Sequence, residues 1–271
     1  MLWKNRRSSG NIVDQRRFGG GAMSVGGLLV GAVVYYLMGG NPMVYLAQNA
    51  GTMQRQEVTP ESDEQKQFVS VVLADTEDVW NSIFRANNRA YKEPKLVLFS
   101  GAVSSACGKA SSAIGPFYCP MDQQVYLDLS FFRDLSSSLG AKGDFARAYV
   151  VAHEVGHHVQ NLMGIAGSVR EQQEAMGERG RNQLSVKLEL QADCFAGVWA
   201  RQTEREKKIL ESGDLEEAIT AAAAVGDDRL QQASRGEVVP DSFTHGTSAQ
   251  RVQAFKIGFS NGEMESCTKV F

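Results

Sequence analysis

The feature that most restricts the fold of this chain is a long uncharged stretch near its N-terminus. No Asp, Glu, Lys or Arg occurs from Phe18 to Gln54, and residues 23–38 are apolar apart from one serine. With its flanking Gly, Ala and Phe residues, this stretch reaches the roughly 20 residues that a helix needs to span a bilayer. The residues before it are basic, with a single acid, Asp14, among Lys4, Arg6, Arg7, Arg16 and Arg17. The pattern predicts a membrane anchor.

The basic residues also predict the orientation of this anchor. The positive-inside rule places the N-terminus in the cytoplasm and the rest of the chain outside the membrane. We therefore expect a basic N-terminus (1–22), a transmembrane signal anchor (23–46), a linker (47–60) and one folded domain (61–271). A cleaved signal peptide is an alternative, although no clean pair of small residues marks a cleavage site after the apolar stretch. A buried helix or hairpin in a soluble fold is a second alternative.

The composition of the chain indicates a globular body. With 271 residues, of which 43% are hydrophobic and 22% charged, the chain can bury a core of ordinary size. With a formal net charge of −3, the chain has no basic surface for phosphate binding outside its extreme N-terminus, so nucleic acid is excluded as a partner.

The periodicity of apolar residues predicts a mostly helical α+β domain with a small sheet. Helical spacing runs from Thr59 to Tyr91, and again over 144–164, 184–203, 216–226 and 249–259. Short apolar runs at 95–100 and 124–129 predict strands, and the second of these could pair with an extended peptide at a sheet edge. The segments 101–122, 171–183 and 227–247 lack periodicity and are predicted to be irregular.

The four cysteines suit an extracytoplasmic domain. Cys107 and Cys119 could close a short loop, and Cys194 could pair with Cys267. Four cysteines allow three pairings, and buried free thiols remain an alternative for the second pair. No CxxC spacing occurs, so the sequence does not support a cysteine zinc site.

The sequence His153-Glu154-Val155-Gly156-His157 has the HExxH spacing and lies inside a predicted helix. Residues four apart share a helix face, so both imidazoles could bind one Zn²⁺, and Glu154 could act as general base toward a water on the metal. Only four histidines occur in the chain, which makes a chance match improbable. His158 lies about 100° around the helix from His157, so it is predicted to pack or to support a ligand.

A catalytic zinc needs a third protein ligand and an open position. Gln160 and Met163 replace the Gly and His of the metzincin pattern, which excludes that class. Glu174, Glu178 and Glu189 are the acidic candidates, and Glu189 is preferred because it lies one helical turn before Asp193 on the same face. Asp193 could then accept the free N–H of a ligand histidine.

These motifs resemble those of a known family. HEVGHH, followed by ELQAD and THGTSAQR, is similar to the gluzincin arrangement, and SACGKASSAIGPFYCPMDQQVYLDLSFF and KLELQADCFAGVWA resemble the bacterial "putative neutral zinc metallopeptidases" over nearly the whole chain. The resemblance implies Zn²⁺ as cofactor and Glu189 as third ligand. It also implies His245 as a donor to the oxyanion, with Arg251 behind it to orient it or add charge. A single-pass protein of the bacterial cell membrane is expected.

The sequence thus predicts a membrane-anchored zinc metallopeptidase that hydrolyses a peptide or protein substrate, with membrane lipid contacted by the N-terminal helix. The alternative is a non-hydrolytic, membrane-tethered zinc-binding or scaffold protein. Two histidines, one acid and an intact general base favour hydrolysis, because structural zinc sites are usually closed by four Cys or His ligands.

Overall fold

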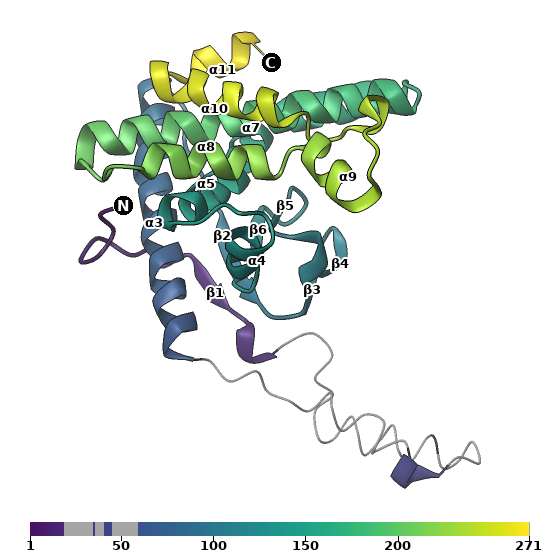
Figure 1. Ribbon diagram of the computed structural model, residues 1–271. Helices are drawn as coiled ribbons and strands as arrows, with labels where there is room; N and C mark the ends of the chain where they lie inside the picture. Colours follow the sequence, from purple (N-terminus) through teal and green to yellow (C-terminus); the bar gives the residue numbers. More distant parts are fainter. Residues whose placement is uncertain (19–34, 36–40, 45–58, 271) are drawn as a thin grey trace.

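The structure is a computed structural model that describes residues 1–18, 35, 41–44 and 59–270 (Figure 1). Long helices form most of the domain, and a small sheet packs beside them, with α3 (Pro60–Ala86) along one side. The remaining helices are α4 (Phe131–Ser137), α5 (Asp144–Leu162), α6 (Ile165–Glu174), α7 (Glu178–Lys207), α8 (Asp214–Ala224), α9 (Asp227–Arg235), α10 (Ser248–Asn261) and α11 (Met264–Val270).

The main sheet has the strand order β1-β2-β6-β5. Strands β1 (Ile12–Asp14), β2 (Lys95–Phe99) and β6 (Gln124–Asp128) are parallel, whereas β5 (Phe117–Cys119) runs antiparallel to β6 and forms one edge. A separate hairpin joins β3 (Ala102–Ser105) to β4 (Gly108–Ser111), and short 3-10 turns occur at Arg16–Phe18, Ser112–Ile114 and Pro240–Ser242.

One hydrophobic core connects the sheet to α3, α5, α7 and α10. Its largest fully buried side chains include Trp80, Tyr149, Phe195, Trp199 and Phe255. Burial of each such aromatic side chain removes roughly 150–250 Å² from water. Helices α5 and α7 meet in the centre of this core. The positions of the residues on their facing sides are therefore fixed by packing.

The α+β part of the predicted fold class is confirmed, because the described chain is mostly helical with small sheets. Helix α3 begins as predicted: the Thr59 side chain caps it by accepting from the Ser62 backbone N–H, and Pro60 is its first residue. It ends at Ala86, several residues before Tyr91. Both expected strands are present, as are all of the expected helices after Asp144.

Three segments predicted to be irregular contain regular structure. The segment 101–122 contains the hairpin and β5, residues 171–174 and 178–183 belong to α6 and α7, and residues 227–235 form α9. The hairpin strands and α9 were missed because they carry few apolar residues, and β5 was missed because three residues are too few to show a period. Helices exposed over most of their surface lack the apolar stripe from which periodicity is recognised.

Both expected disulfides are formed. Cys107 pairs with Cys119 and joins the β3–β4 hairpin to the end of β5, while Cys194 of α7 pairs with Cys267 of α11. The alternative of free thiols is therefore not realised, and the described chain holds no free cysteine.

The basic N-terminal residues are part of the folded body. Strand β1 pairs with β2, and the arginines before it bind acids of α3: Arg6 with Asp75 at 2.5 Å, and Arg7 with Glu77 at 3.0 Å. The Met1 ammonium lies 2.6 Å from Asp144. The prediction of a separate basic N-terminus (1–22) was wrong, because the acidic partners of these charges are distant in sequence and could not be recognised from it.

The predicted membrane anchor, residues 23–46, lies for its greater part outside the described residues. Within the part of the chain that the structure describes, no helix is both long enough and apolar enough to cross a bilayer.

Candidate metal centre

Helix α5 carries the HExxH residues on a face that is turned into the domain. Its apolar residues at 145, 148, 149, 151, 152, 155 and 159 are fully buried, which fixes the rotation of the helix against the core. His153 and His157 are four residues apart, so their rings lie next to each other on one face, edge to face with centroids 4.8 Å apart. The local sequence alone therefore brings the two imidazoles together.

Helix α7 approaches this face unusually closely because residue 156 is glycine. A Cβ atom at Gly156 would lie 2.9 Å from the backbone oxygen of Ala192 and 3.1 Å from its Cα. Any larger side chain would push the helices apart. This contact between α5 and α7 places Glu189, one turn before Asp193, opposite the two imidazoles.

The three side chains meet at separations that suit one metal ion. His153 Nε2 lies 3.2 Å from Glu189 Oε2, and His157 Nε2 lies 3.3 Å from Glu189 Oε1. Ligand atoms about 2.0–2.1 Å from a tetrahedral zinc are about 3.3 Å from one another. Among the described residues, His153, His157 and Glu189 form a group whose ligand atoms all lie within 4.8 Å of each other. The donor set and its spacing fit zinc.

The other nitrogen of each imidazole is also bound. His153 Nδ1 lies 2.8 Å from Asp193 Oδ1, and His157 Nδ1 lies 2.9 Å from Gln160 Oε1. The Gln160 amide in turn donates to the carbonyl of Leu188 at 2.7 Å. These contacts orient both rings so that Nε2 faces Glu189, as carboxylate and amide partners do in metal sites.

Asp193 is the centre of a fully buried polar cluster. Arg251 donates to it through Nε at 2.8 Å and Nη2 at 2.9 Å, and the Tyr149 hydroxyl donates to Oδ1. Burial alone would raise the pKa of Asp193, but Arg251 and His153 outweigh it and lower the pKa. The carboxylate therefore stays charged in the interior and neutralises Arg251.

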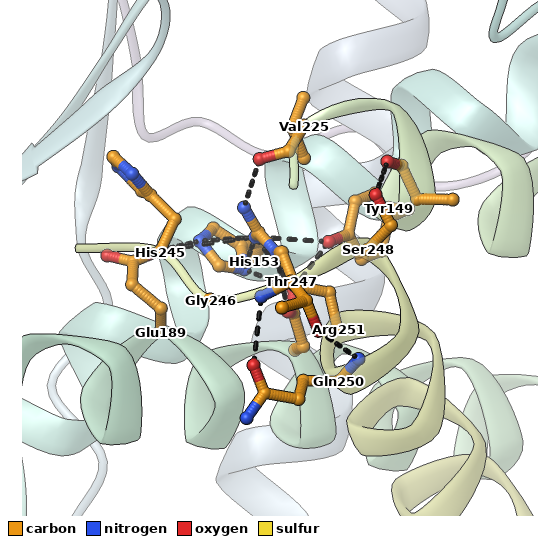
Figure 2. Close-up of polar contacts among 12 residues, drawn as sticks. Tyr149, His153, Glu189, Val225, His245, Gly246, Thr247, Ser248, Gln250 and Arg251 are labelled. Carbon is orange, nitrogen blue, oxygen red and sulfur yellow. Dashed lines mark hydrogen bonds and ion pairs between the residues drawn. The ribbon is translucent and has the colours of Figure 1, made fainter. Parts of the chain in front are cut away.

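Arg251 reaches this cluster because α10 packs tightly on α7. A Cβ at Gly258 would lie 1.9 Å from the backbone oxygen of Cys194, so only glycine permits this approach. The position corrects the expectation that Arg251 orients His245. In Figure 2 the His245 ring points away from Arg251, whose Nη1 donates instead to the Val225 carbonyl at 3.2 Å.

The carboxylates and imidazoles of the centre strongly affect one another's ionisation. Burial would raise the pKa of Glu189, but His157 and His153 outweigh it and hold that pKa well below its usual value. Burial would lower the pKa of His153, yet Asp193 and Glu189 raise it to about 10. The cluster thus attracts positive charge at the position that a metal cation would take, and metal binding would displace these protons.

Glu154 lies beside the three candidate ligands and is not one of them. Its side chain lines the same cleft, and only 8% of the residue is exposed. Burial raises the pKa of Glu154 above that of an ordinary glutamate, against the opposing effect of His153 and His157. A carboxylate with a raised pKa can accept a proton near neutral pH, as a general base must.

His245 lies on the loop before α10, at the wall of the cleft. Asp227 holds this loop: one of its carboxylate oxygens accepts the backbone N–H groups of residues 244, 245 and 246 at 2.8, 2.6 and 3.1 Å. The other oxygen lies 3.2 Å from His245 Nδ1. The ring is therefore oriented by Asp227, with Nε2 on its other edge, and half of the side chain is exposed.

Strand β5 forms the opposite wall of the cleft and is anchored on α5. The Tyr118 hydroxyl lies 3.0 Å from His158 Nδ1 and accepts from Asn161 Nδ2 at 3.1 Å, while His158 Nε2 donates to the Lys92 carbonyl. Burial lowers the pKa of His158 to about 4. His158 thus packs as a neutral side chain, as its position on the helix predicts.

The strand suggested for edge pairing must be corrected. Strand β6, the predicted 124–129 strand, lies between β2 and β5 and has no free edge. The edge of the sheet on this side is β5, whose residues Phe117 and Tyr118 line the cleft. Periodicity shows that a segment is a strand, but the order of strands depends on the tertiary fold.

The structure brings together every predicted ligand and supporting residue: His153, Glu154, His157, Glu189 and Asp193. Glu174 and Glu178, the other acidic candidates, do not belong to the ligand group. The sequence did not predict three residues that orient the site: Tyr149, Gln160 and Asp227. Tyr149 and Gln160 lie one turn from a ligand histidine on the same helix, which is a usable signal, whereas Asp227 has no such signal because it is distant in sequence from His245.

With this geometry established, comparisons with known proteins define the class of the protein. The family model described as "Putative neutral zinc metallopeptidase" matches residues 1–270, and the chain belongs to this family. No solved structure matches the chain significantly.

Two bacterial relatives illustrate the range of the similarity. The "Uncharacterized protein YpfJ" of Escherichia coli (strain K12) is 48% identical over 287 aligned positions, covering 98% of each chain. The "Uncharacterized protein Rv2575" of Mycobacterium tuberculosis (strain H37Rv) is 43% identical over 210 positions, covering 74% of this chain and 70% of the relative.

Proposed function

We propose that this protein is a zinc metallopeptidase that hydrolyses peptide bonds. The observation that carries the proposal is the placement of two imidazoles and Glu189 at tetrahedral separations, beside the buried carboxylate of Glu154 and open to a cleft. Three protein ligands leave one position for the reaction, which distinguishes catalytic zinc sites from closed structural ones.

His153, His157 and Glu189 would hold the metal. Their mixed nitrogen and oxygen donors suit zinc better than magnesium or calcium, which prefer oxygen alone. When bound, zinc acts as a Lewis acid that polarises the scissile carbonyl and lowers the pKa of water. Asp193 and Gln160 would keep the two rings in the orientation that binding requires.

The residues around the metal would carry the proton transfers. Glu154 takes a proton from the attacking water as the new C–O bond forms. It then passes that proton to the amine nitrogen as the C–N bond breaks. His245, which Asp227 orients, would donate through Nε2–H to the oxyanion that develops on the carbonyl oxygen.

The substitution Glu154→Gln separates metal binding from catalysis. Because Glu154 is not a ligand, the variant should bind zinc with the same stoichiometry and stability as the wild type. Its peptide-bond hydrolysis should fall on the order of 10²–10⁴-fold, the usual contribution of a general base. Zinc content is measured by atomic absorption, and turnover with a broad library of fluorogenic peptides. Glu178→Gln, an exposed change on α7, is the matched control and should leave both unchanged.

Two results would contradict the proposal. Wild-type protein that holds one zinc and cleaves no member of the library would favour the non-hydrolytic, membrane-tethered zinc-binding alternative. Equal turnover by the wild type and Glu154→Gln would remove Glu154 from the mechanism.

We further propose that the predicted anchor segment, residues 23–46, attaches the protein to a bacterial membrane, with the catalytic domain on the extracytoplasmic side. The two disulfides support an oxidising compartment. Residues 1–18 and α3, which flank the segment, pack in one body, so we propose that both flanks lie on the same side of the membrane.

The sidedness can be tested by labelling intact cells with a thiol reagent that does not cross membranes. Ser8→Cys and Glu263→Cys place exposed thiols in the N-terminal residues and near the C-terminus. Equal labelling of both supports placement on one side. If only the thiol of Glu263→Cys is labelled, the N-terminus lies in the cytoplasm and the chain crosses the membrane once, as the basic N-terminus predicts.

A further inference from the structure

The cleft is chemically asymmetric along α5, the helix that carries the two histidines. It has a volume of about 850 Å³, enough to hold several side chains of an extended peptide. Toward the N-terminal half of α5 its lining is mostly apolar, with Val150 on α5 and Leu139 and Phe131 from the region of α4, whose Phe132 ring lies under Arg147 of α5. Ile114 and Pro116, on the loop before β5, also line the cleft, and Gly115 between them lies against the Phe131 ring. Ile114 is 62% exposed, so the apolar wall extends to the rim.

Toward the C-terminal half of α5 the lining is more polar and contains a cation, with Ala166 and Leu188 as its apolar members. Gln160, Gln173, Ser185 and Arg170 line this half. Gln173 fixes α6 to α7 by donating to Ser185 Oγ at 3.0 Å, and Arg170 lies one turn before it on α6. Arg170 is exposed and forms no ion pair with any residue that the structure describes.

Arg170 differs in this respect from the other arginine of the cleft. Arg251 is buried and its charge is neutralised by the bidentate contact with Asp193. Arg170 is therefore the arginine whose charge is available to a ligand. A guanidinium in a cleft recognises carboxylates through two parallel hydrogen bonds.

An acidic residue in the apolar half of the cleft reinforces this asymmetry. Asp134 of α4 lines the apolar half, and its carboxylate has no ion pair within the described chain. It would repel an acidic side chain placed on that side. Selectivity arises from such repulsion as much as from attraction.

The two halves lie on opposite sides of the candidate metal centre. Val150 and Gln160 are ten positions apart on α5, a distance of about 15 Å at 1.5 Å per residue. His153 and His157 lie between them. An extended peptide covers that distance with about four to five residues at roughly 3.3 Å each. A peptide laid along α5 thus presents different side chains to the two halves, with its scissile bond between.

We propose that the cleft selects peptides with a bulky apolar side chain on one side of the scissile bond and an acidic side chain on the other. The apolar residue would contact Leu139 and Val150, and the acidic residue would contact Arg170. This inference rests on the proposed peptidase function and adds a substrate class to it.

The test uses the full-length, zinc-loaded protein with a peptide series. Each peptide contains one bulky apolar residue. Every position within four residues of it is occupied in turn by Glu, Ala or Lys. Cleavage by the wild type is followed by mass spectrometry. Binding to Glu154→Gln, which should hold peptides without cutting them, is measured by fluorescence anisotropy. We expect Glu to be preferred over Lys at one position across the scissile bond, by about 3- to 10-fold for a partly exposed charge pair.

Charge reversal provides the decisive comparison. Arg170→Glu should invert the preference at that position to Lys, in cleavage and in binding. Lys187→Glu, an exposed reversal on α7 outside the cleft, is the matched control and should leave the preference unchanged. Leu139→Ala should lower the preference for a bulky apolar residue on the other side on the order of 10-fold.

The outcomes distinguish this inference from the proposed function. Cleavage without a charge preference, or a preference that Arg170→Glu leaves unchanged, overturns the inference and leaves the peptidase function standing. Charge-selective binding without any cleavage supports the recognition by Arg170 but contradicts hydrolysis. If the protein neither binds nor cleaves any peptide, both the inference and the proposed function are overturned.

Discussion

Replacing Asp193 by Asn should both destabilise the domain and weaken metal binding. The Asp193 side chain is completely buried and accepts from His153 Nδ1 at 2.8 Å and from Arg251 at 2.8 and 2.9 Å, as well as from Tyr149. Asn has the same shape but no charge. Arg251 would then remain buried with Glu189 as its nearest acid, 3.9 Å away.

The size of the effect follows from these contacts. Removing one partner of a buried ion pair costs about 3–5 kcal/mol, because the remaining charge is left in the interior. We expect this decrease in the free energy of unfolding, measured by urea denaturation with a chelator present so that metal binding does not contribute. Losing the carboxylate behind His153 should raise the zinc dissociation constant about 10–100-fold.

Two further variants make this prediction decisive. Asp75→Asn removes another buried acid, which binds Arg6 and Lys207 far from the site, so it should lower stability without changing zinc affinity. Asp193→Asn/Arg251→Gln removes the uncompensated charge and should recover part of the lost stability. A loss below about 1 kcal/mol in Asp193→Asn, with unchanged zinc affinity, would refute the reasoning.

Three other predictions concern the site and its support. Glu189→Ala should abolish stoichiometric zinc binding while Glu178→Ala retains it; the reverse pattern in metal analysis would assign the third ligand to Glu178. The pKa of His158, about 4 when folded against 6.5 in the unfolded chain, means that stability is full above pH 6.5 and is lost as the pH falls toward 4. Urea denaturation should show a loss of about 2 kcal/mol between pH 7 and 5 from this group, absent in His158→Gln; equal slopes would contradict it. Asp227→Asn should lower kcat with little change in zinc content, to nearly the level of His245→Ala, and adding it to His245→Ala should have little further effect on kcat; additive losses would show that Asp227 does not act through His245.

Local sequence determined the parts of this protein whose residues are neighbours along the chain. Helix α5 and its paired histidines follow from apolar periodicity and a four-residue spacing, and the relation between Glu189 and Asp193 is one helical turn. The cap at Thr59 and the helical fold class are local in the same sense. Exposed helices such as α9 were missed because, without an apolar stripe, a polar helix and a polar loop have similar sequences.

The tertiary structure alone decided which distant residues meet. Arg6 and Arg7 were interpreted as a membrane signal because their partners on α3 lie about 70 residues away, at Asp75 and Glu77. Arg251 pairs with Asp193 rather than supporting His245 because glycines allow α10 to pack against α7. Charges and hydrogen-bond donors have no periodicity that reveals their partners. Their roles are fixed only when packing of the helices brings them within hydrogen-bond distance.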